Sequence, residues 1–228
     1  DVCSSDLDKI VFSSTAATYG EPTSIPIMES DRTQPTNCYG ETKLTMEKMM
    51  GWVGQAHGLK SVALRYFNAA GSDTEAGIGE DHNPESHLIP LVMKTALGQR
   101  DHIGIFGEDY PTRDGTCVRD YIHVCDLASG HVAALNWMNG KTGVEIFNLG
   151  TGTGTSVLEV VAAFSKACGK ELPYVIRERR AGDIAANWCD ASKAERMMGW
   201  KAQYDIADMC RDSWNWQSHN PNGFADAE

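Results

Sequence analysis

The chain has 228 residues and a mass of 24.9 kDa, with 42% hydrophobic and 22% charged residues, which is typical of a globular protein with a sizeable core. Its formal net charge of −11 argues against a nucleic-acid partner. No run approaches the ~18 apolar residues of a membrane span and no secretory signal opens the chain, so we expect a cytoplasmic protein without a membrane partner. The seven cysteines include no C-x-x-C pair, which favours reduced thiols and predicts no metal site.

Residues 1–7 differ in character from the rest of the chain. They join abruptly to a strand-like run, and no initiating Met precedes them. We interpret 1–7 as a non-native leader and exclude it from fold reasoning.

Hydrophobic periodicity predicts alternating strands and helices. In chain order these are a strand at 9–14, a helix at 39–57, a strand at 61–66, a long loop at 68–86, a helix at 88–97, strands at 103–106 and 119–124, a helix at 126–138, a strand at 144–149, a helix at 156–168, a strand at 174–177, and helices at 192–198 and 206–218. The alternation predicts an α/β parallel sheet with an appended smaller region, and a loop as long as 68–86 is usually functional.

Tyr39 and Lys43 lie four positions apart at the start of the predicted helix 39–57. Four residues make just over one helical turn, so the phenol and the ammonium project from the same face. A cation close to a phenol favours the phenolate, and the Thr15 hydroxyl at the preceding strand end can hydrogen-bond the same substrate oxygen. This arrangement suits hydride chemistry on an alcohol, whereas the alternative from spacing alone is an exposed Tyr and Lys at a helix start.

The segment Gly150–Thr155 alternates glycine and threonine between a predicted strand and a predicted helix, where a phosphate-binding loop can lie. A dinucleotide fingerprint needs G-x-G-x-x-G and an acidic residue about twenty positions later, and here the third glycine comes early. We therefore interpret the segment as a tight turn with Ser156 as a helix cap. No better glycine-rich loop exists in the chain, so a nicotinamide enzyme built from it would carry its phosphate-binding half upstream of residue 8.

Several sequence strings carry a more specific signal. They are Phe12–Gly20, Tyr39–Lys43, Arg65–Asn68, Gly107–Thr112, Val118–Val124 and Asn148–Gly152. In this order they resemble the UDP-glucose 4-epimerases, a family of extended short-chain dehydrogenase/reductases, and the resemblance runs from Lys9 to about Phe224.

The resemblance implies a Rossmann-type doubly wound parallel sheet, with its N-terminal half missing here, and a smaller α/β C-terminal region for a UDP-sugar. Residues 8–228 would form a partial NAD-dependent epimerase/dehydratase domain, with the UDP-sugar region mainly at 68–115 and 150–228. NAD would be the cofactor and the complete protein a homodimer. The implied activity is reversible epimerization of UDP-glucose and UDP-galactose at C4 through a 4-keto intermediate, and we expect the 228-residue chain alone to be inactive.

The resemblance also assigns residues. Tyr39 would take the proton from the 4-hydroxyl, Lys43 would bind the nicotinamide ribose and favour the tyrosinate, and Thr15 would assist proton transfer. Contacts with NAD would come from Ser13, Ser14, Tyr39, Lys43 and Phe67. Contacts with the UDP-sugar would come from Thr15, Asn68, His87, Leu88, Gly104, Ile105, Phe106, Arg119, Arg180, Asp183 and Asn187, with the arginines on the diphosphate and Asp183 on the uridine ribose.

Some positions separate this chain from its relatives. Ala16 and Ala17 follow Thr15, where sugar-nucleotide 4,6-dehydratases carry Asp-Glu, so the acid and base for elimination are missing. His87 stands where Asn is frequent, which leaves its contact open. Asn187, intermediate in size, suggests that UDP-N-acetylglucosamine and UDP-N-acetylgalactosamine also fit.

Other interpretations stay open. The chain can be a non-catalytic nucleotide-sugar-binding remnant, or part of another sugar-nucleotide epimerase of the same superfamily. His123, with Asp126 nearby, is interpreted as a structural histidine because no ligand spacing or G-x-S-x-G elbow accompanies it.

Overall fold

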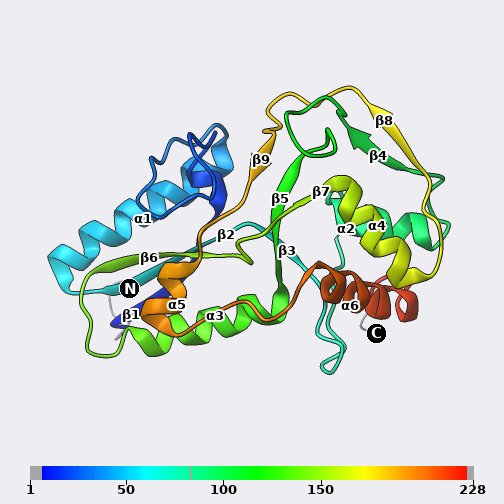
Figure 1. The fold of residues 1–228 in the computed structure, drawn as a ribbon. Coiled ribbons are helices and arrows are strands. Elements are labelled where there is room, and N and C mark those ends of the chain that lie inside the picture. The colour runs from blue at the N-terminus through cyan, green and yellow to red at the C-terminus, as the bar shows by residue number, and fades with distance from the viewer. Residues whose placement is uncertain (1–6, 83, 225–228) are drawn as a thin grey trace.

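The computed structural model of the protein describes residues 7–82 and 84–224 (Figure 1). Apart from Leu7, the predicted leader lies outside the described residues. The strands are β1 (Lys9–Ser13), β2 (Lys60–Tyr66), β3 (Asn68–Ala70), β4 (Ile103–Phe106), β5 (Val118–His123), β6 (Val144–Leu149), β7 (Gly154–Ser156), β8 (Tyr174–Arg177) and β9 (Ala186–Asn187). The helices are η1 (Ala16–Thr18, 3-10), α1 (Cys38–His57), α2 (Leu88–Ala96), α3 (Val124–Trp137), α4 (Val157–Cys168), α5 (Ser192–Met198) and α6 (Ile206–His219).

One parallel sheet has the strand order β1-β2-β6, with Val11 paired to Val62 and Leu64 to Phe147. β2 is central, and its residues Ser61–Arg65 are all buried because both of its faces are covered, as is usual in parallel sheets. Its Val62 and Leu64 are fully buried and pack with Ala134 and Met138 at the α3 side and with Trp200 after α5. In Figure 1 the helices α1, α3 and α5 flank this sheet.

A second unit forms around β5. This strand pairs in parallel with β3 and β9 and antiparallel with β7, while β4 and β8 form a separate parallel pair. The helices α2, α4 and α6 lie together on this side of the molecule (Figure 1). They enclose a core in which Phe164 and Met209 are fully buried.

Residues 188–190, which follow β9, pair through their backbone with Ile27, which follows η1. The backbone N–H of Ile27 donates to the carbonyl of Trp188 at 2.9 Å, and the N–H of Asp190 donates to the carbonyl of Ile27 at 2.9 Å. Ile27 and Cys189 are fully buried at this bridge. The segment after β9 therefore seals the region that follows η1.

The predicted α/β class with parallel sheets is confirmed, and most predicted elements agree with the structure to within two residues. The prediction of a continuous loop at 68–86 was wrong, because Asn68–Ala70 forms β3 against β5. β7, β9 and η1 were not predicted, because two or three residues are too few to show a period. The two strands also depend on pairing with β5, which is distant in the sequence. Among the described residues no helix is both long and apolar enough to cross a bilayer.

Candidate active site

The start of α1 places Tyr39 and Lys43 beside the end of β1. Asn37 caps the helix by accepting a hydrogen bond from the N–H of Gly40 at 2.8 Å. Tyr39 is 52% exposed, and the Lys43 ammonium lies 5.7 Å from the centre of its ring. The same ammonium donates to the carbonyl of Ser13 at 2.8 Å. Phenol and ammonium therefore share one helix face next to the carboxyl end of a parallel strand, as the spacing predicts.

Thr15 is joined to this pair through a close contact between α1 and η1. A Cβ at Gly40 would lie 2.5 Å from the carbonyl oxygen of Ala17, so only glycine lets the first turn of α1 sit this closely on η1. The buried Thr15 hydroxyl accepts a hydrogen bond from the N–H of Ala17 at 3.2 Å, which leaves its own proton able to donate. The two segments that carry Thr15 and Tyr39 thus meet directly.

The predicted cofactor residues near this point are engaged within the fold. The Ser13 hydroxyl lies 2.9 Å from His131 Nε2, and the fully buried Ser14 hydroxyl donates to Glu47 at 2.5 Å. Phe67 packs against a small buried cluster made of Ala16, Tyr19 and Ile27. The role of these residues in binding a cofactor stays a prediction.

A cavity of 290 Å³ gathers most of the predicted substrate residues. They are Asn68, His87, Leu88, Gly104, Ile105, Phe106, Arg119, Arg180 and Asp183, together with Ser86, Leu91, Cys117, Tyr121 and Val157. These residues come from segments far apart in the sequence, including β3, the start of α2, β4 and the loop after β8. The structure therefore brings together positions that no local pattern connects.

The cavity combines positive charge with an apolar wall. The Arg180 guanidinium lies 4.6 Å from the centre of the Phe106 ring, and its Nε donates to Asp183 Oδ2 at 2.9 Å. Arg119 is oriented by donating from Nη1 to the carbonyls of Val118 and Ile184 at 2.9 and 2.8 Å. Guanidinium groups suit phosphate oxygens and the carboxylate can accept from hydroxyls. Such a cavity fits an anionic ligand that carries hydroxyl groups.

Thr15 and Asn187 are the predicted substrate residues that do not line this cavity. Asn187 lies in β9, in register with Arg119 of β5. Its Oδ1 atom is buried and has no hydrogen-bond partner among the described residues. An acceptor without a donor beside a cavity arginine marks a place where a ligand can contribute one.

The glycine-threonine segment after β6 is a closed turn. The Asp120 carboxylate accepts hydrogen bonds from the N–H and hydroxyl of Thr151 at 2.9 and 2.7 Å and from the N–H of Gly152 at 3.2 Å. Ser156 caps α4 in a reciprocal capping box with Glu159. A buried carboxylate therefore occupies the position that a phosphate would need, and the interpretation as a turn with a Ser156 cap is confirmed.

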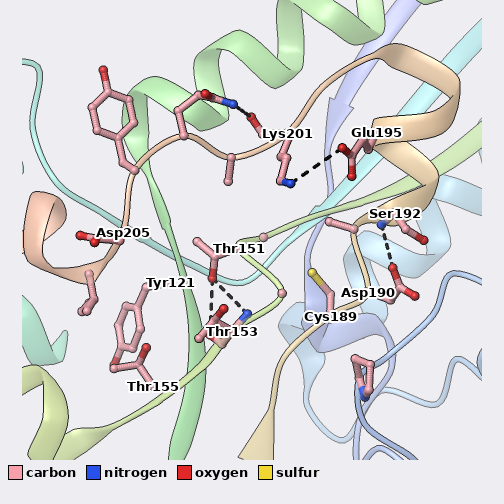
Figure 2. A pocket seen from close by; sticks show the side chains of 18 of the residues that line it. Tyr121, Thr151, Thr153, Thr155, Cys189, Asp190, Ser192, Glu195, Lys201 and Asp205 are labelled. Atoms are coloured by element: carbon pink, nitrogen blue, oxygen red, sulfur yellow. Dashed lines mark hydrogen bonds and ion pairs between the residues drawn. The ribbon is translucent and has the colours of Figure 1, made fainter.

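A larger cavity of 510 Å³ adjoins this turn. Figure 2 shows Thr151 and Thr153 on the turn, Cys189 beside it, and the ion pair of Lys201 with Glu195 across the cavity. Its walls lack the phenol, ammonium and guanidinium groups described above. Size alone therefore does not select the active site.

His123 has a structural position. It is 1% exposed, its Nδ1 accepts a hydrogen bond from the N–H of Cys125 at 3.1 Å, and its ring stacks on Tyr204 at 4.3 Å. Its Nε2 faces Asp212 Oδ2 at 3.3 Å without hydrogen-bond geometry. Asp126 accepts from the N–H groups of Gln203 and Tyr204 rather than from His123. The prediction of a structural histidine agrees with these contacts.

Sequence reasoning missed the buried polar network that supports the site. Glu47 of α1 pairs with Arg65 of β2, and the Arg65 guanidinium lies 4.7 Å from the centre of the Tyr19 ring. Tyr19 donates to Asn148 Oδ1 at 2.6 Å, and burial raises the pKa of its phenol. Tyr19, Arg65 and Asn148 lie in the strings that carry the family resemblance, but no role was assigned to them because their mutual contacts join distant parts of the sequence.

Comparisons with known proteins agree with this geometry. A profile of the family described as "GDP-mannose 4,6 dehydratase" matches residues 3–213. The chain is 52% identical to a UDP-glucose 4-epimerase of Halalkalibacterium halodurans and 51% identical to that of Bacillus subtilis, over 96% of the chain and 66% of each relative. The crystal structure of UDP-glucose 4-epimerase from Bifidobacterium longum in complex with NAD+ and UDP superimposes with a TM-score of 0.90 at 50% identity, covering 95% of this chain and 65% of that one. The chain thus spans about two thirds of the length of the relatives it matches.

Proposed function

The chain belongs to the UDP-glucose 4-epimerase family of NAD-dependent epimerases and dehydratases, and from this membership we propose that it carries the catalytic pair and the substrate pocket for interconverting UDP-glucose and UDP-galactose at C4. The single observation that carries the proposal is the placement of Tyr39 and Lys43 on one helix face beside Ser13, in direct contact through Gly40 with the segment of Thr15. The finer architecture that we propose is a doubly wound Rossmann sheet that contains β1, β2 and β6.

The residues at the carboxyl ends of β1 and β2 fit a nicotinamide cofactor. Ligands of α/β sheets bind outside these strand ends. Here the Lys43 ammonium donates to the Ser13 carbonyl that ends β1 and lies 5.7 Å from the centre of the exposed Tyr39 ring. When bound, NAD supplies the acceptor and donor of hydride. Lys43 would then hold a ribose hydroxyl and keep a positive charge close to the phenol.

Tyr39 acts as the base in this proposal. Its phenolate accepts the proton of the sugar 4-hydroxyl, and Thr15 donates a hydrogen bond to the same oxygen. With the C4 hydride passed to the cofactor, the sugar would be a 4-keto intermediate. It must turn over so that the hydride returns to its other face and Tyr39 returns the proton to the alcohol of opposite configuration. Tyr39 is 52% exposed, so a sugar can reach its side chain.

The 290 Å³ cavity supplies the nucleotide-binding part of the proposal. Arg119 and Arg180 would bind the diphosphate, Asp183 the uridine ribose, and the wall around Phe106 the base. The structure from Bifidobacterium longum contains NAD+ and UDP by its own description. A nucleoside diphosphate is the anionic, hydroxyl-bearing ligand that these groups suit.

Epimerization is favoured over dehydration even though the matching profile is described as a dehydratase. Elimination of water needs an extra acid and base next to the catalytic hydroxyl, and Thr15 is followed by Ala16 and Ala17 in η1. The methyl groups of these residues cannot transfer a proton. The Oδ1 atom of Asn187, which has no donor within the described part of the chain, supports the further proposal that UDP-N-acetylhexosamines are accepted, since an acetamido N–H is a donor.

Pairing of two chains through α1 and α3 is also part of the proposal. Both helices expose large apolar side chains, including Trp52 at 71% and Val132 at 60%. Such faces are typical of surfaces that another subunit covers. Size-exclusion chromatography with light scattering tests this point.

Calorimetric titration of the purified chain with UDP tests the cavity. We expect Arg180→Ala to weaken binding by roughly 10- to 150-fold, because a charge-assisted hydrogen bond contributes about 1.5–3 kcal/mol, whereas Arg177→Ala, on β8 outside the cavity lining, leaves it unchanged. Equal affinities of the two variants would contradict the assignment.

Turnover of UDP-galactose with NAD, by the gene product that carries this chain, tests the chemistry. Tyr39→Phe should lower kcat by about 10²- to 10⁴-fold while UDP still binds, and Tyr174→Phe, at an exposed tyrosine of β8, should not. Formation of a 4-keto-6-deoxy sugar would assign a dehydratase instead.

A further inference from the structure

The loop before α2 brings together four side chains of metal-binding type. Glu80, His82, Glu85 and His87 each offer one ligand atom, and these atoms all lie within 4.8 Å of one another. We propose that this set binds a divalent transition-metal ion of the zinc class. The site is separate from the proposed epimerase chemistry and does not depend on it, although His87 also lines the 290 Å³ cavity.

The separations between the ligand atoms are close to those of a tetrahedral shell, with the two oxygens of Glu85 facing different histidines. The His82 Nδ1 atom lies 3.0 Å from Glu80 Oε1 and 3.3 Å from Glu85 Oε2. The His87 Nδ1 atom lies 3.5 Å from Glu80 Oε1 and 2.9 Å from Glu85 Oε1. Ligands at zinc bond lengths of about 2.0–2.2 Å are separated by roughly 3.3–3.6 Å at tetrahedral angles. The His82 and His87 side chains are 54% and 63% exposed, so small adjustments of these two rings can complete the shell around the more buried Glu80 and Glu85.

The cluster combines two carboxylates with two imidazoles around one point. The rings of His82 and His87 are 5.4 Å apart, and the Nδ1 atom of each lies within 3.3 Å of an oxygen of Glu85. A single cation at the centre attracts both carboxylates and uses both Nδ1 lone pairs. Imidazole and carboxylate are the ligand types that zinc accepts in proteins.

The segment around the ligands is held from both ends. A Cβ at Gly79 would lie 2.0 Å from the Trp216 ring, and the Trp216 indole donates to the carbonyl of Gly77 at 3.2 Å. On the other side, His87 is the N-cap residue of α2.

Individual ligands are also positioned. The Glu85 side chain is only 2% exposed and accepts from its neighbouring backbone N–H groups at Ser86 and His87, at 2.7 and 2.6 Å. Asp81, next to Glu80, accepts from the N–H of Phe224 at 2.9 Å. Ligands that are oriented before binding lose less entropy when the metal arrives.

The test is metal binding by the purified 228-residue chain after treatment with a chelator and alkylation of accessible thiols. We expect calorimetry to show one equivalent of Zn²⁺ bound, and Co²⁺ used as a probe to give the intense visible absorption of a tetrahedral complex. His82→Ala and Glu85→Gln should each weaken Zn²⁺ binding at least about tenfold. His57→Ala, which removes an exposed histidine at the end of α1, should leave it unchanged.

A loss of Zn²⁺ binding in a variant can be distinguished from a loss of its fold. The His82 side chain is 54% exposed, so its removal leaves the core intact, and far-UV circular dichroism checks each variant. The absence of stoichiometric Zn²⁺ binding would overturn the proposal. So would an affinity that falls equally in His57→Ala and His82→Ala, or a Co²⁺ spectrum that shows only octahedral coordination.

Discussion

Glu47 and Arg65 form a buried ion pair that joins α1 to β2. The Arg65 Nε donates to Glu47 Oε1 at 3.0 Å and Nη2 donates to Oε2 at 2.5 Å, with both side chains less than 5% exposed. Glu47 also accepts from Ser14, the residue before Thr15. One carboxylate two turns after Tyr39 therefore fixes the helix with the phenol to the strand end with the threonine.

Glu47→Gln should destabilise the protein strongly. It leaves the Arg65 guanidinium buried without its counter-charge, which costs about 3–5 kcal/mol when one partner of such a pair is removed. Urea unfolding followed by circular dichroism measures the loss. Glu171→Gln, at an exposed carboxylate, should stay within about 0.5 kcal/mol of the parent. A loss below about 1 kcal/mol for Glu47→Gln would mean that water reaches the pair.

Two glycines of α1 should respond in opposite directions to alanine. Gly40→Ala pushes a methyl group against the Ala17 carbonyl and should both destabilise the protein and displace Tyr39 from Thr15. Gly51→Ala meets no atom within 4 Å and should stabilise by up to about 1 kcal/mol, because alanine is the better helix former. Thermal unfolding of both variants checks the signs. Equal effects of the two substitutions would contradict the close contact between α1 and η1.

Asp120 should give the protein a specific pH dependence. Burial raises the pKa of this carboxyl, despite hydrogen bonds from Thr151 and Cys189 that lower it. The folded state therefore holds this proton more tightly than the unfolded chain. The stability that this carboxyl contributes is full below the unfolded pKa of about 3.9 and is lost as pH rises through the higher folded value.

The variant Asp120→Asn isolates this effect. Its amide turns a donor toward backbone N–H groups and should destabilise the protein by about 1–3 kcal/mol. Because the variant does not titrate there, the difference in unfolding free energy from the parent should narrow from about pH 4 upward. Urea titrations at several pH values measure it. A difference that widens with pH would show that the hydrogen bonds outweigh burial.

The thiols should differ sharply in reactivity. Cys38 is exposed, whereas Cys189 and Cys210 are fully buried. Burial raises the pKa of Cys210 to about 12, and burial together with Asp120 raises that of Cys189 well above its usual range. Since the thiolate is the reactive form, iodoacetamide at pH 8 should label Cys38 before Cys189 and Cys210, as read by peptide mass spectrometry. Labelling of Cys210 at the rate of Cys38 in the native protein would contradict the packing of α6.

The longer elements could be predicted from the sequence because their patterns are local. Ile103–Phe106 and Val144–Leu149 are apolar runs of strand length, and both agree with the structure. The turn at Gly150–Thr155 was recognised from the spacing of its glycines. β3, β7 and β9 were missed because their only cause is pairing with β5.

The same distinction, between features with a local sequence pattern and features that depend on distant residues, applies to the candidate site. The common face of Tyr39 and Lys43 follows from helix geometry alone, and the structure agrees. The prediction that Arg119 and Arg180 bind the same ligand came only from the family resemblance, since no local pattern tells which distant segments line one cavity. The cluster at 80–87 was not predicted, because metal ligands were sought only around His123. The prediction of no metal site therefore disagrees with the zinc-class site proposed above.

The bridge between Ile27 and Cys189 bears on how the chain comes off the ribosome. Synthesis runs from the N-terminus and domains fold as their residues emerge, but the backbone partners of Ile27 appear only after about 160 further residues. Until then the segment after η1 has an open backbone edge. A nascent chain halted before Asp190 would therefore expose an unpaired strand edge to chaperones, although every residue of the catalytic pair had already been made.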